Sequence, residues 1–416
     1  MLLGATADDV TGATDLCNTL VREGMRTVQT MGVVRELELP EVDAVVVGLK
    51  SRTAPVAAAV RDSTAALAWL QELGARQFFF KYCSTFDSTP EGNIGPVGDA
   101  LLDALDAEIT VVCPAFPANE RTVYQGHLFV GGQLLSESSM AYHPLTPMTD
   151  SNLVRFLGTQ TRRRVGLVPH ATVREGADAI ARRLEELRRD GISYAVVDAL
   201  VDDDLRAIGA ACADLPLVTG GSGVAVGLPE NFRRRGLLRD AERAATLPSI
   251  EGPAAVLAGS SSSATQEQVR RMAARFPAIK VDPVARDGDF DALTRTALAR
   301  LDEGAVLVYS TAPPDEVARV QERLGAANAS HAIEALFAAL ARRLVEHGAR
   351  TLVVAGGETS GAVLQSLGIR ALAVGDEIAP GVPWMRSLGE PPLSLALKSG
   401  NFGGPDFFLE AVEAAT

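Results

Sequence analysis

Short apolar runs recur along the chain, and each is followed by a longer stretch in which apolar residues return every three or four positions. The runs are apolar almost without interruption, as expected for strands of a parallel sheet that is covered on both faces. The longer stretches have the period of amphipathic helices. The pattern therefore predicts an α/β protein in which mainly parallel sheets are flanked by helices. The runs lie at 44–49, 78–80, 109–113, 194–198, 254–258, 305–309 and 351–355.

Two features break this alternation. Residues 128–130 and 133–135 flank a Gly131-Gly132 pair, which is a two-residue hairpin signal and predicts a small antiparallel insert. Residues 244–253 then separate the first half of the chain from a fresh strand. We therefore expect two domains, 1–245 and 252–416, with the antiparallel insert in the first.

Composition narrows the class of protein. The chain has 416 residues, of which 47% are hydrophobic, so it can bury a large core and is not disordered. Acidic residues outnumber basic ones by 52 to 39, and no block of lysine or arginine interrupts them. A surface of this kind repels phosphate backbones, so nucleic acid is not an expected partner. No run approaches the roughly 18 apolar residues of a membrane helix, so a membrane is not expected either.

The cysteines and the N-terminal residues indicate the cellular compartment in which the protein is expected. The four cysteines are widely spaced and form no CxxC pair, which argues against a disulfide framework and against a structural zinc site. Acidic residues follow the first strand at once, without a basic segment or a long apolar leader. We therefore expect a cytoplasmic protein with free thiols; the sequence leaves a homo-oligomer open.

Asp8 and Asp9 follow the first strand and precede a helix that starts near Thr11. Ligands of parallel α/β sheets bind at the carboxyl ends of the strands, where paired carboxylates can accept a hydroxyl proton, hold polyol hydroxyls or coordinate a metal. The alternative interpretation is an aspartate that caps the helix. The Asp-Asp-Val-Thr-Gly sequence favours a site over a cap.

Residues 81–93 follow another apolar strand and are dense in small polar groups. Lys81 offers a cation for a carboxylate or phosphate, and Asp87, Ser88 and Thr89 offer further polar contacts. A plain surface loop is the alternative. Arg121 follows the strand at 109–113 and could bind a carboxylate through two hydrogen bonds, although a lone arginine is often a surface residue. A proline-rich turn at 143–148 is a weaker candidate for closing over a ligand.

Glycine-rich turns join strands to helices in the second half, at 259–265 and 356–361, and a third such loop lies at 398–404. Backbone N–H groups at helix starts bind phosphate, so two such turns in one domain indicate a nucleotide. Neither turn matches the P-loop or the GxGxxG fingerprint, and each alone could be a simple connection. Residues 219–223 form a similar stretch at the end of the first half.

Taken in order, the segments at 7–13, 114–117, 220–223, 356–361 and 398–403 resemble the four-carbon acid sugar kinases, which phosphorylate short sugar acids with ATP. Each segment is weak alone, but the ordered set is specific and runs from end to end of the chain. The resemblance implies an N-terminal domain that binds the sugar acid and a C-terminal domain that binds ATP. It also implies nucleotide contacts from a serine such as Ser260 or Ser262, and from Gly356, Gly357, Glu358, Thr359 and Gly400.

Within the family, residues 81–93 resemble the 3-oxo-tetronate kinase branch. Threonate- and erythronate-type kinases have a shorter version of this segment with an arginine just before Gly-Asn, where this chain has Glu91. The resemblance therefore implies phosphorylation of 3-oxo-tetronate at its 4-hydroxyl, with a D-threonate or D-erythronate kinase as the alternative. Other classes left open are a sugar-acid dehydrogenase, against which the missing GxGxxG counts, and a non-catalytic sugar-acid sensor.

A kinase needs positioning, charge neutralisation and a metal more than covalent chemistry. We expect Mg²⁺ to accompany ATP, with ligands that the sequence does not identify. Asp9 is expected to orient or deprotonate the hydroxyl and Asp8 to hold neighbouring hydroxyls. Lys81 and Arg121 are expected to neutralise the substrate carboxylate or the transferring phosphoryl group.

Overall fold

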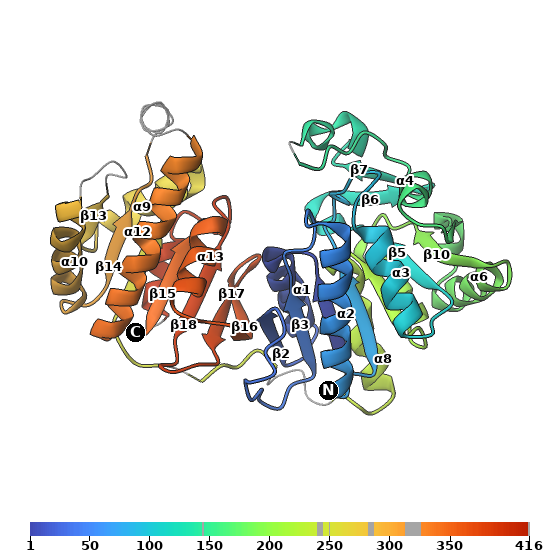
Figure 1. The fold of residues 1–416 in the computed structure, drawn as a ribbon, viewed down its shortest axis with the longest axis horizontal. Coiled ribbons are helices and arrows are strands. Elements are labelled where there is room, and N and C mark those ends of the chain that lie inside the picture. Colours follow the sequence, from blue (N-terminus) through green and yellow to red (C-terminus); the bar gives the residue numbers. More distant parts are fainter. Residues whose placement is uncertain (144, 239–243, 249, 282–286, 313–325, 415–416) are drawn as a thin grey trace. The chain divides into compact units, whose positions relative to one another are not determined.

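The computed structural model describes residues 1–416 except 144, 239–243, 249, 282–286, 313–325 and 415–416. The chain divides into two compact units, Met1–Ala245 and Thr246–Thr416. Each unit is an α/β layer structure of its own (Figure 1). Within the described residues, no helix is long and apolar enough to cross a membrane.

The sheet of the first unit is parallel throughout, in the order β2-β3-β1-β4-β11-β5-β10-β9. Strands β1, β3, β4 and β5 are buried along their whole length, which explains their continuous apolar runs. The eight strands are β1 Leu3–Ala7, β2 Thr27–Met31, β3 Ala44–Gly48, β4 Gln77–Lys81, β5 Thr110–Cys113, β9 Arg164–Val168, β10 Ile192–Val197 and β11 Leu217–Gly220.

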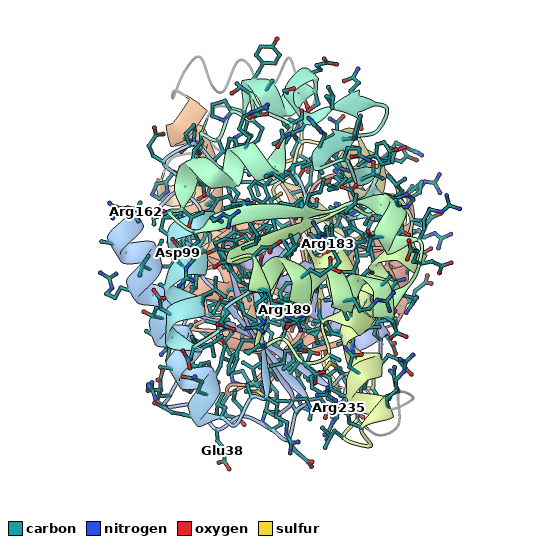
Figure 2. All side chains as sticks on the ribbon, turned by 90° about the vertical axis from the view of Figure 1, so that its right-hand side faces the viewer. Glu38, Asp99, Arg162, Arg183, Arg189 and Arg235 are labelled. Carbon is teal, nitrogen blue, oxygen red and sulfur yellow. The ribbon has the colours of Figure 1, made fainter. Side chains whose placement is uncertain are left out.

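Two groups of helices cover this sheet. The connections through α2 and α3 run along the sheet in the direction opposite to those through α1, α6 and α7, so right-handed crossovers place the two groups on opposite faces. Arg183 and Arg189, labelled in Figure 2, belong to the polar face of α6 and pair with glutamates of the same helix. The helices are α1 Val10–Arg22, α2 Val56–Glu72, α3 Ile94–Ala104, α4 Leu153–Gln160, α5 His170–Val173, α6 Ala177–Arg189, α7 Asp202–Ala211 and α8 Leu228–Arg234.

A three-stranded antiparallel sheet is inserted after β5. It comprises β6 Arg121–Tyr124, β7 His127–Val130 and β8 Gln133–Leu134. Gly131 turns the chain between β7 and β8 with a φ of 58°, a conformation that glycine adopts without strain. The predicted antiparallel insert is confirmed.

The second unit has a mixed sheet in the order β13-β14-β12-β15-β18-β17-β16, in which β17 alone of these strands runs antiparallel to its neighbours, β18 and β16. Its core contains Val256, Leu307, Val353 and Phe407. The predicted α/β class with mainly parallel sheets is therefore confirmed. The elements are β12 Ala254–Ala258, α9 Ser263–Ala273, β13 Ala278–Lys280, α10 Asp287–Leu301, β14 Val306–Tyr309, α12 Ala326–His347, β15 Thr351–Ala355, α13 Gly357–Ser366, β16 Ala371–Ala379, β17 Val382–Ser387, β18 Ser394–Lys398 and α14 Phe407–Glu413.

Candidate active site

The carboxyl ends of β1 and β4 bring the first two predicted segments together. These strands are neighbours, with Ala7 paired to Lys81, and the Asp8 backbone N–H donates to the Lys81 carbonyl at 3.0 Å. The loop after β3 joins them, because the N–H groups of Ser51 and Arg52 donate to the Asp8 carbonyl at 3.0 and 3.2 Å. Three strand ends thus form one cluster of charged side chains.

Arg52 is the centre of this cluster. Its guanidinium donates two hydrogen bonds of 2.9 Å to the Asp8 carboxylate, lies 2.9 Å from Asp9 Oδ1 and lies 3.8 Å from Asp87 Oδ2. Asp8 is buried; burial raises its pKa and the Arg52 guanidinium opposes that rise. Two hydrogen bonds to a guanidinium fix the plane of the carboxylate, so Asp8 is held in one orientation.

Asp9 has the capping role that was weighed for it and keeps one carboxylate oxygen out of the cap. It caps α1, because its Oδ1 accepts from the Gly12 N–H at 2.9 Å. Its other oxygen, Oδ2, has no hydrogen bond within the described part of the chain, and its side chain is 32% exposed against 6% for Asp8. Asp9 is therefore the carboxylate of the pair that can still reach a ligand.

Lys81 lies beside Asp9 and the start of α1. It is buried and its ammonium donates to the Tyr82 carbonyl at 3.0 Å. A Cβ atom at position 12 would overlap Asp9 Oδ1 and lie 3.0 Å from Lys81 Nζ, so Gly12 allows the lysine and the aspartate to approach the first turn of the helix. A cation and a free carboxylate oxygen are thus close together at this end of the sheet.

The predicted segment 81–93 curves around the same cluster. Buried Phe86 has a φ of 56°, which is rare for a bulky residue and turns the chain just before Asp87. Thr85 donates to Asp87 Oδ1 at 2.6 Å, and Gln160 of α4 donates to the Ser88 hydroxyl at 2.9 Å and to the Thr89 carbonyl at 2.6 Å. Asp87 therefore belongs to the charged cluster, and the main contacts of Ser88 and Thr89 here are with the scaffold.

Neither Arg52 as a site residue nor the hydrogen bonds that fix its loop were identified from the sequence. The Asn93 side-chain amide donates to the carbonyls of Ser51 and Ala54 at 2.7 and 2.8 Å and so fixes the loop that carries Arg52. A signal existed, since Arg52 follows the apolar run at 44–49 just as Asp8 and Lys81 follow their strands.

Other predicted positions lie outside this cluster in the described structure. Arg121 begins β6 in the antiparallel insert and donates to the Asn119 carbonyl. His143 accepts from the Thr146 N–H at 3.1 Å, which is a local turn, and Pro144 lies outside the described residues. A Cβ atom at Gly220 would overlap the carbonyl oxygen of Cys113, the last residue of β5, and one at Gly221 would press on that of Pro114, so these glycines serve close backbone packing.

In the second unit, the three glycine loops follow adjacent strands, β12, β15 and β18. The N–H groups of Gly259 and Ser260 donate to the Ala355 carbonyl at 2.9 and 3.1 Å. A Cβ atom at Gly259 would overlap the Thr359 hydroxyl, and one at Gly400 would overlap the Ser260 hydroxyl and lie 3.0 Å from that of Ser262. The structure therefore brings the predicted nucleotide residues of all three loops together.

Among the three glycine loops, the one at the start of α13 leaves room for a ligand. Gly356 has a φ of 127° and precedes the helix, and a Cβ atom at Gly357 would have no neighbour within 4 Å. Glu358 is exposed. Burial raises the pKa of Glu334 on α12, and the nearby Glu358 carboxylate adds to that rise. The first helical turn, whose N–H groups lack acceptors within the helix, therefore begins at an accessible position that suits an anion.

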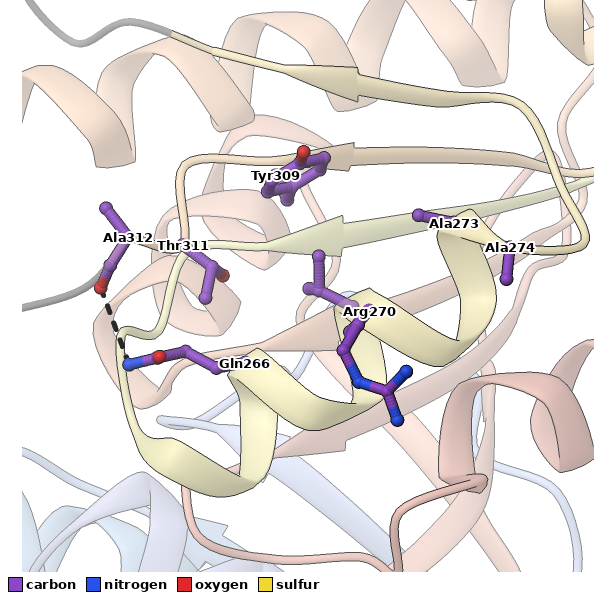
Figure 3. A pocket seen from close by; sticks show the side chains of 8 residues that line it. Gln266, Arg270, Ala273, Ala274, Tyr309, Thr311 and Ala312 are labelled. Atoms are coloured by element: carbon purple, nitrogen blue, oxygen red, sulfur yellow. Dashed lines mark hydrogen bonds between the residues drawn. The ribbon is translucent and has the colours of Figure 1, made fainter.

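A pocket of about 600 Å³ lies beside these loops, between α9 and the end of β14 (Figure 3). Gln266 spans its edge and donates to the Ala312 carbonyl at 3.5 Å. Arg270 lines it but pairs with Glu267 of the same helix. The pocket is lined by Gln266, Val269, Arg270, Ala273, Ala274, Tyr309, Thr311 and Ala312, which include none of the predicted nucleotide residues.

Comparisons with known proteins agree with this division of chemistry. Residues 3–228 match the family model described as a sugar-binding N-terminal domain, and residues 255–408 match the one described as a nucleotide-binding C-terminal domain. A Cupriavidus necator protein named 3-oxo-tetronate kinase is 57% identical over 99% of this chain and 96% of its own length. A Salmonella typhimurium protein of the same name is 47% identical over 98% of each chain.

Solved structures give the same result. The crystal structure of a Haemophilus influenzae protein is 45% identical, with a TM-score of 0.90 over 99% of this chain and all of the other. That of a Salmonella typhimurium protein is 47% identical, with a TM-score of 0.92 over 98% of each chain. The chain therefore belongs to the four-carbon acid sugar kinase family.

Proposed function

We propose that this kinase transfers the γ-phosphoryl group of ATP to the 4-hydroxyl of 3-oxo-tetronate and forms the 4-phosphate. The observation that carries the proposal is the full-length similarity to proteins named 3-oxo-tetronate kinase. The first unit would bind the sugar acid and the second would bind ATP. The four free cysteines suit the reducing conditions of the cytoplasm, where we place the reaction.

In the first unit, Asp9 is the proposed base. Its Oδ2 is free to accept the proton of the 4-hydroxyl, while Arg52 and the helix cap hold its Oδ1. Asp8, oriented by Arg52, would hold a neighbouring hydroxyl. Lys81 would neutralise charge on the substrate or on the transferring group, because no carboxylate contacts its ammonium within the described residues.

The remaining substrate contacts are proposed for Asp87, Ser88, Thr89 and Arg121. Gln160 donates to Ser88, so the Ser88 hydroxyl hydrogen is still available to a ligand. Arg121 makes no contact with the Arg52 cluster in the described structure. It would contact the substrate only if the antiparallel insert approaches the substrate.

In the second unit, ATP fits the open start of α13 and the interlocked glycine loops. Ser260, Ser262, Gly356, Gly357, Glu358, Thr359 and Gly400 are the proposed contacts. Bound Mg²⁺ would neutralise phosphate charge during transfer. Among the described residues, no group of three His, Cys, Asp or Glu side chains forms a metal site, which fits a metal held mainly by phosphates and water.

A coupled ADP-release assay across four-carbon acids tests the proposal. We expect turnover with 3-oxo-tetronate to exceed that with D-threonate and D-erythronate by about a hundredfold in kcat/KM, because a site that hydrogen-bonds one group leaves polar atoms unpaired when that group is absent. Similar efficiency on a reduced acid would move the chain to the alternative branch. NAD(P)H turnover without ADP release would instead indicate a dehydrogenase.

A further inference from the structure

A buried lysine lies directly beneath the proposed nucleotide loops. Lys398 ends β18 and is 2% exposed. Its ammonium donates to the Thr265 hydroxyl and to the Gly400 carbonyl, each at 3.0 Å, and lies 5.8 Å from the centre of the Phe408 ring. Both hydrogen-bond partners are neutral, so the described residues give this cation no counter-charge of its own.

The Gly400 carbonyl is the focus of these contacts. It also accepts from the Ser262 hydroxyl at 2.6 Å and from the Thr265 hydroxyl at 2.9 Å, so three donors converge on one oxygen. In a trans peptide the N–H points opposite to the carbonyl of the same unit. The Asn401 N–H is therefore turned away from the cluster, and it has no acceptor within the described residues.

No charged side chain on the surrounding elements contacts Lys398 in the described structure. On α9 and α14, Arg271 pairs with Glu267 and Asp406, and burial alone lowers the pKa of Lys398 to about 8. An uncompensated buried charge is costly unless a ligand neutralises it. The charged groups on the packed elements are Glu267, Arg270 and Arg271 of α9, Glu358 of α13, Arg386 of β17, and Asp406, Glu410 and Glu413 at α14.

We propose that Lys398 is a positioning residue of the nucleotide site: it holds the Gly400 carbonyl inward so that the Asn401 N–H faces the phosphates, which in turn balance its charge. The inference rests on the proposed function, because it requires ATP to bind these loops. It adds a residue that acts through the loop backbone and that takes its counter-ion from the ligand.

Titration calorimetry on the full chain, with ATP alone as ligand, tests this. Lys398→Met keeps the length of the side chain and removes the charge, and Lys280→Met makes the same change at an exposed lysine of the same unit. We expect the Kd for ATP to rise about tenfold or more in Lys398→Met, as for a lost charged hydrogen bond, and to stay within about twofold in Lys280→Met. Thr265→Val removes one donor but keeps the charge, so a smaller rise is expected.

Proton uptake separates positioning from a merely structural role. At pH 8 in two buffers of different ionisation enthalpy, the wild type should take up about half a proton more than Lys398→Met on binding ATP, because phosphate raises the pKa of the lysine. Thr265→Val should keep this uptake. Unchanged ATP affinity or unchanged uptake in a folded Lys398→Met chain overturns the inference. Absence of ATP binding by the wild type overturns the proposed function instead.

Discussion

The Asp9 carboxylate combines a structural contact through one oxygen with a proposed catalytic role for the other. Oδ1 accepts from the Gly12 N–H and lies against Arg52, whereas Oδ2 has no hydrogen bond within the described residues and is the oxygen proposed to act on the substrate. The helix cap and the ion pair thus fix the side chain without using the oxygen proposed to act as a base. Fixed orientation is worth more to catalysis than basicity alone, because a misaligned base loses most of its effect.

Asp9→Asn should separate these two functions. Asparagine caps helices about as well as aspartate, so the variant should unfold near the wild-type temperature, while kcat falls roughly a hundredfold or more because the amide cannot accept the proton. Steady-state kinetics and ATP binding by calorimetry check this, with ATP affinity unchanged. Asp9→Ala is the matched control and should lose about 1 kcal/mol of stability as well. A kcat close to wild type in Asp9→Asn would leave this residue as a cap.

Lys398 gives the chain a specific pH dependence. Its pKa is about 8 in the folded chain and about 10.4 in an unfolded one, so between these values the unfolded state binds more protons. The free energy of unfolding should therefore rise as the pH increases from about 8 to about 10.4. Urea unfolding of the wild type and Lys398→Met isolates this contribution. The free energy of unfolding of the wild type minus that of Lys398→Met should increase as the pH rises over this range. Parallel curves for the two chains would contradict the lowered pKa.

The strands show where sequence patterns succeed. Fully buried strands such as β3 and β15 were predicted from their continuous apolar runs. Strand β2 was not, because it contains Gln29, whose buried side chain bonds to Thr14 and the Val10 carbonyl on α1. The antiparallel β16 and β17 were also missed, since β17 carries Pro383 and alternates in burial. A buried polar residue that hydrogen-bonds to another element interrupts the apolar run, so the local sequence pattern does not predict the strand.

Some features of the loops at strand ends could also be predicted from the sequence, and others could not. Asp8, Lys81 and the glycine turns could be predicted because they directly follow recognisable strands. The Arg52 cluster could not be assembled from sequence, since the hydrogen bonds between Asn93 and the Arg52 loop join residues about forty positions apart. Pairings of that kind depend on strand order, which periodicity does not provide.

The start of α13 makes a specific prediction for the nucleotide loops. Gly357→Val places a side chain in open space next to the helix start, so we expect a folded protein whose KM for ATP rises at least about tenfold while that for the sugar acid changes little. Gly361→Val is the matched control, because it makes the same substitution in the same helix and a Cβ atom there also meets nothing within 4 Å. Gly400→Val is a poorer test, since its side chain would press on the Ser260 hydroxyl even without ATP. Equal ATP kinetics in the Gly357→Val and Gly361→Val variants would place the phosphates elsewhere.

The division into two units, Met1–Ala245 and Thr246–Thr416, separates the two proposed binding sites. The charged cluster around Arg52 belongs wholly to the first, and the glycine loops with Lys398 belong wholly to the second. Each ligand should therefore stabilise the unit that binds it. A ligand at a hundred times its Kd adds about 2.7 kcal/mol to the free energy of unfolding of the species that it binds.

Amide hydrogen exchange on the full chain can follow both units at once. With ATP alone, we expect slower exchange in peptides from 254–265, 351–361 and 394–402, and little change in those from 3–12, 49–55 and 77–93. A sugar acid alone should give the reverse pattern, because strand ends and loops exchange through local openings that a bound ligand suppresses. The Asp9→Asn and Lys398→Met chains serve as controls, since the second should lose part of the ATP protection and the first should keep it. Protection of the first three peptides by the sugar acid alone would contradict the assignment of ligands to units.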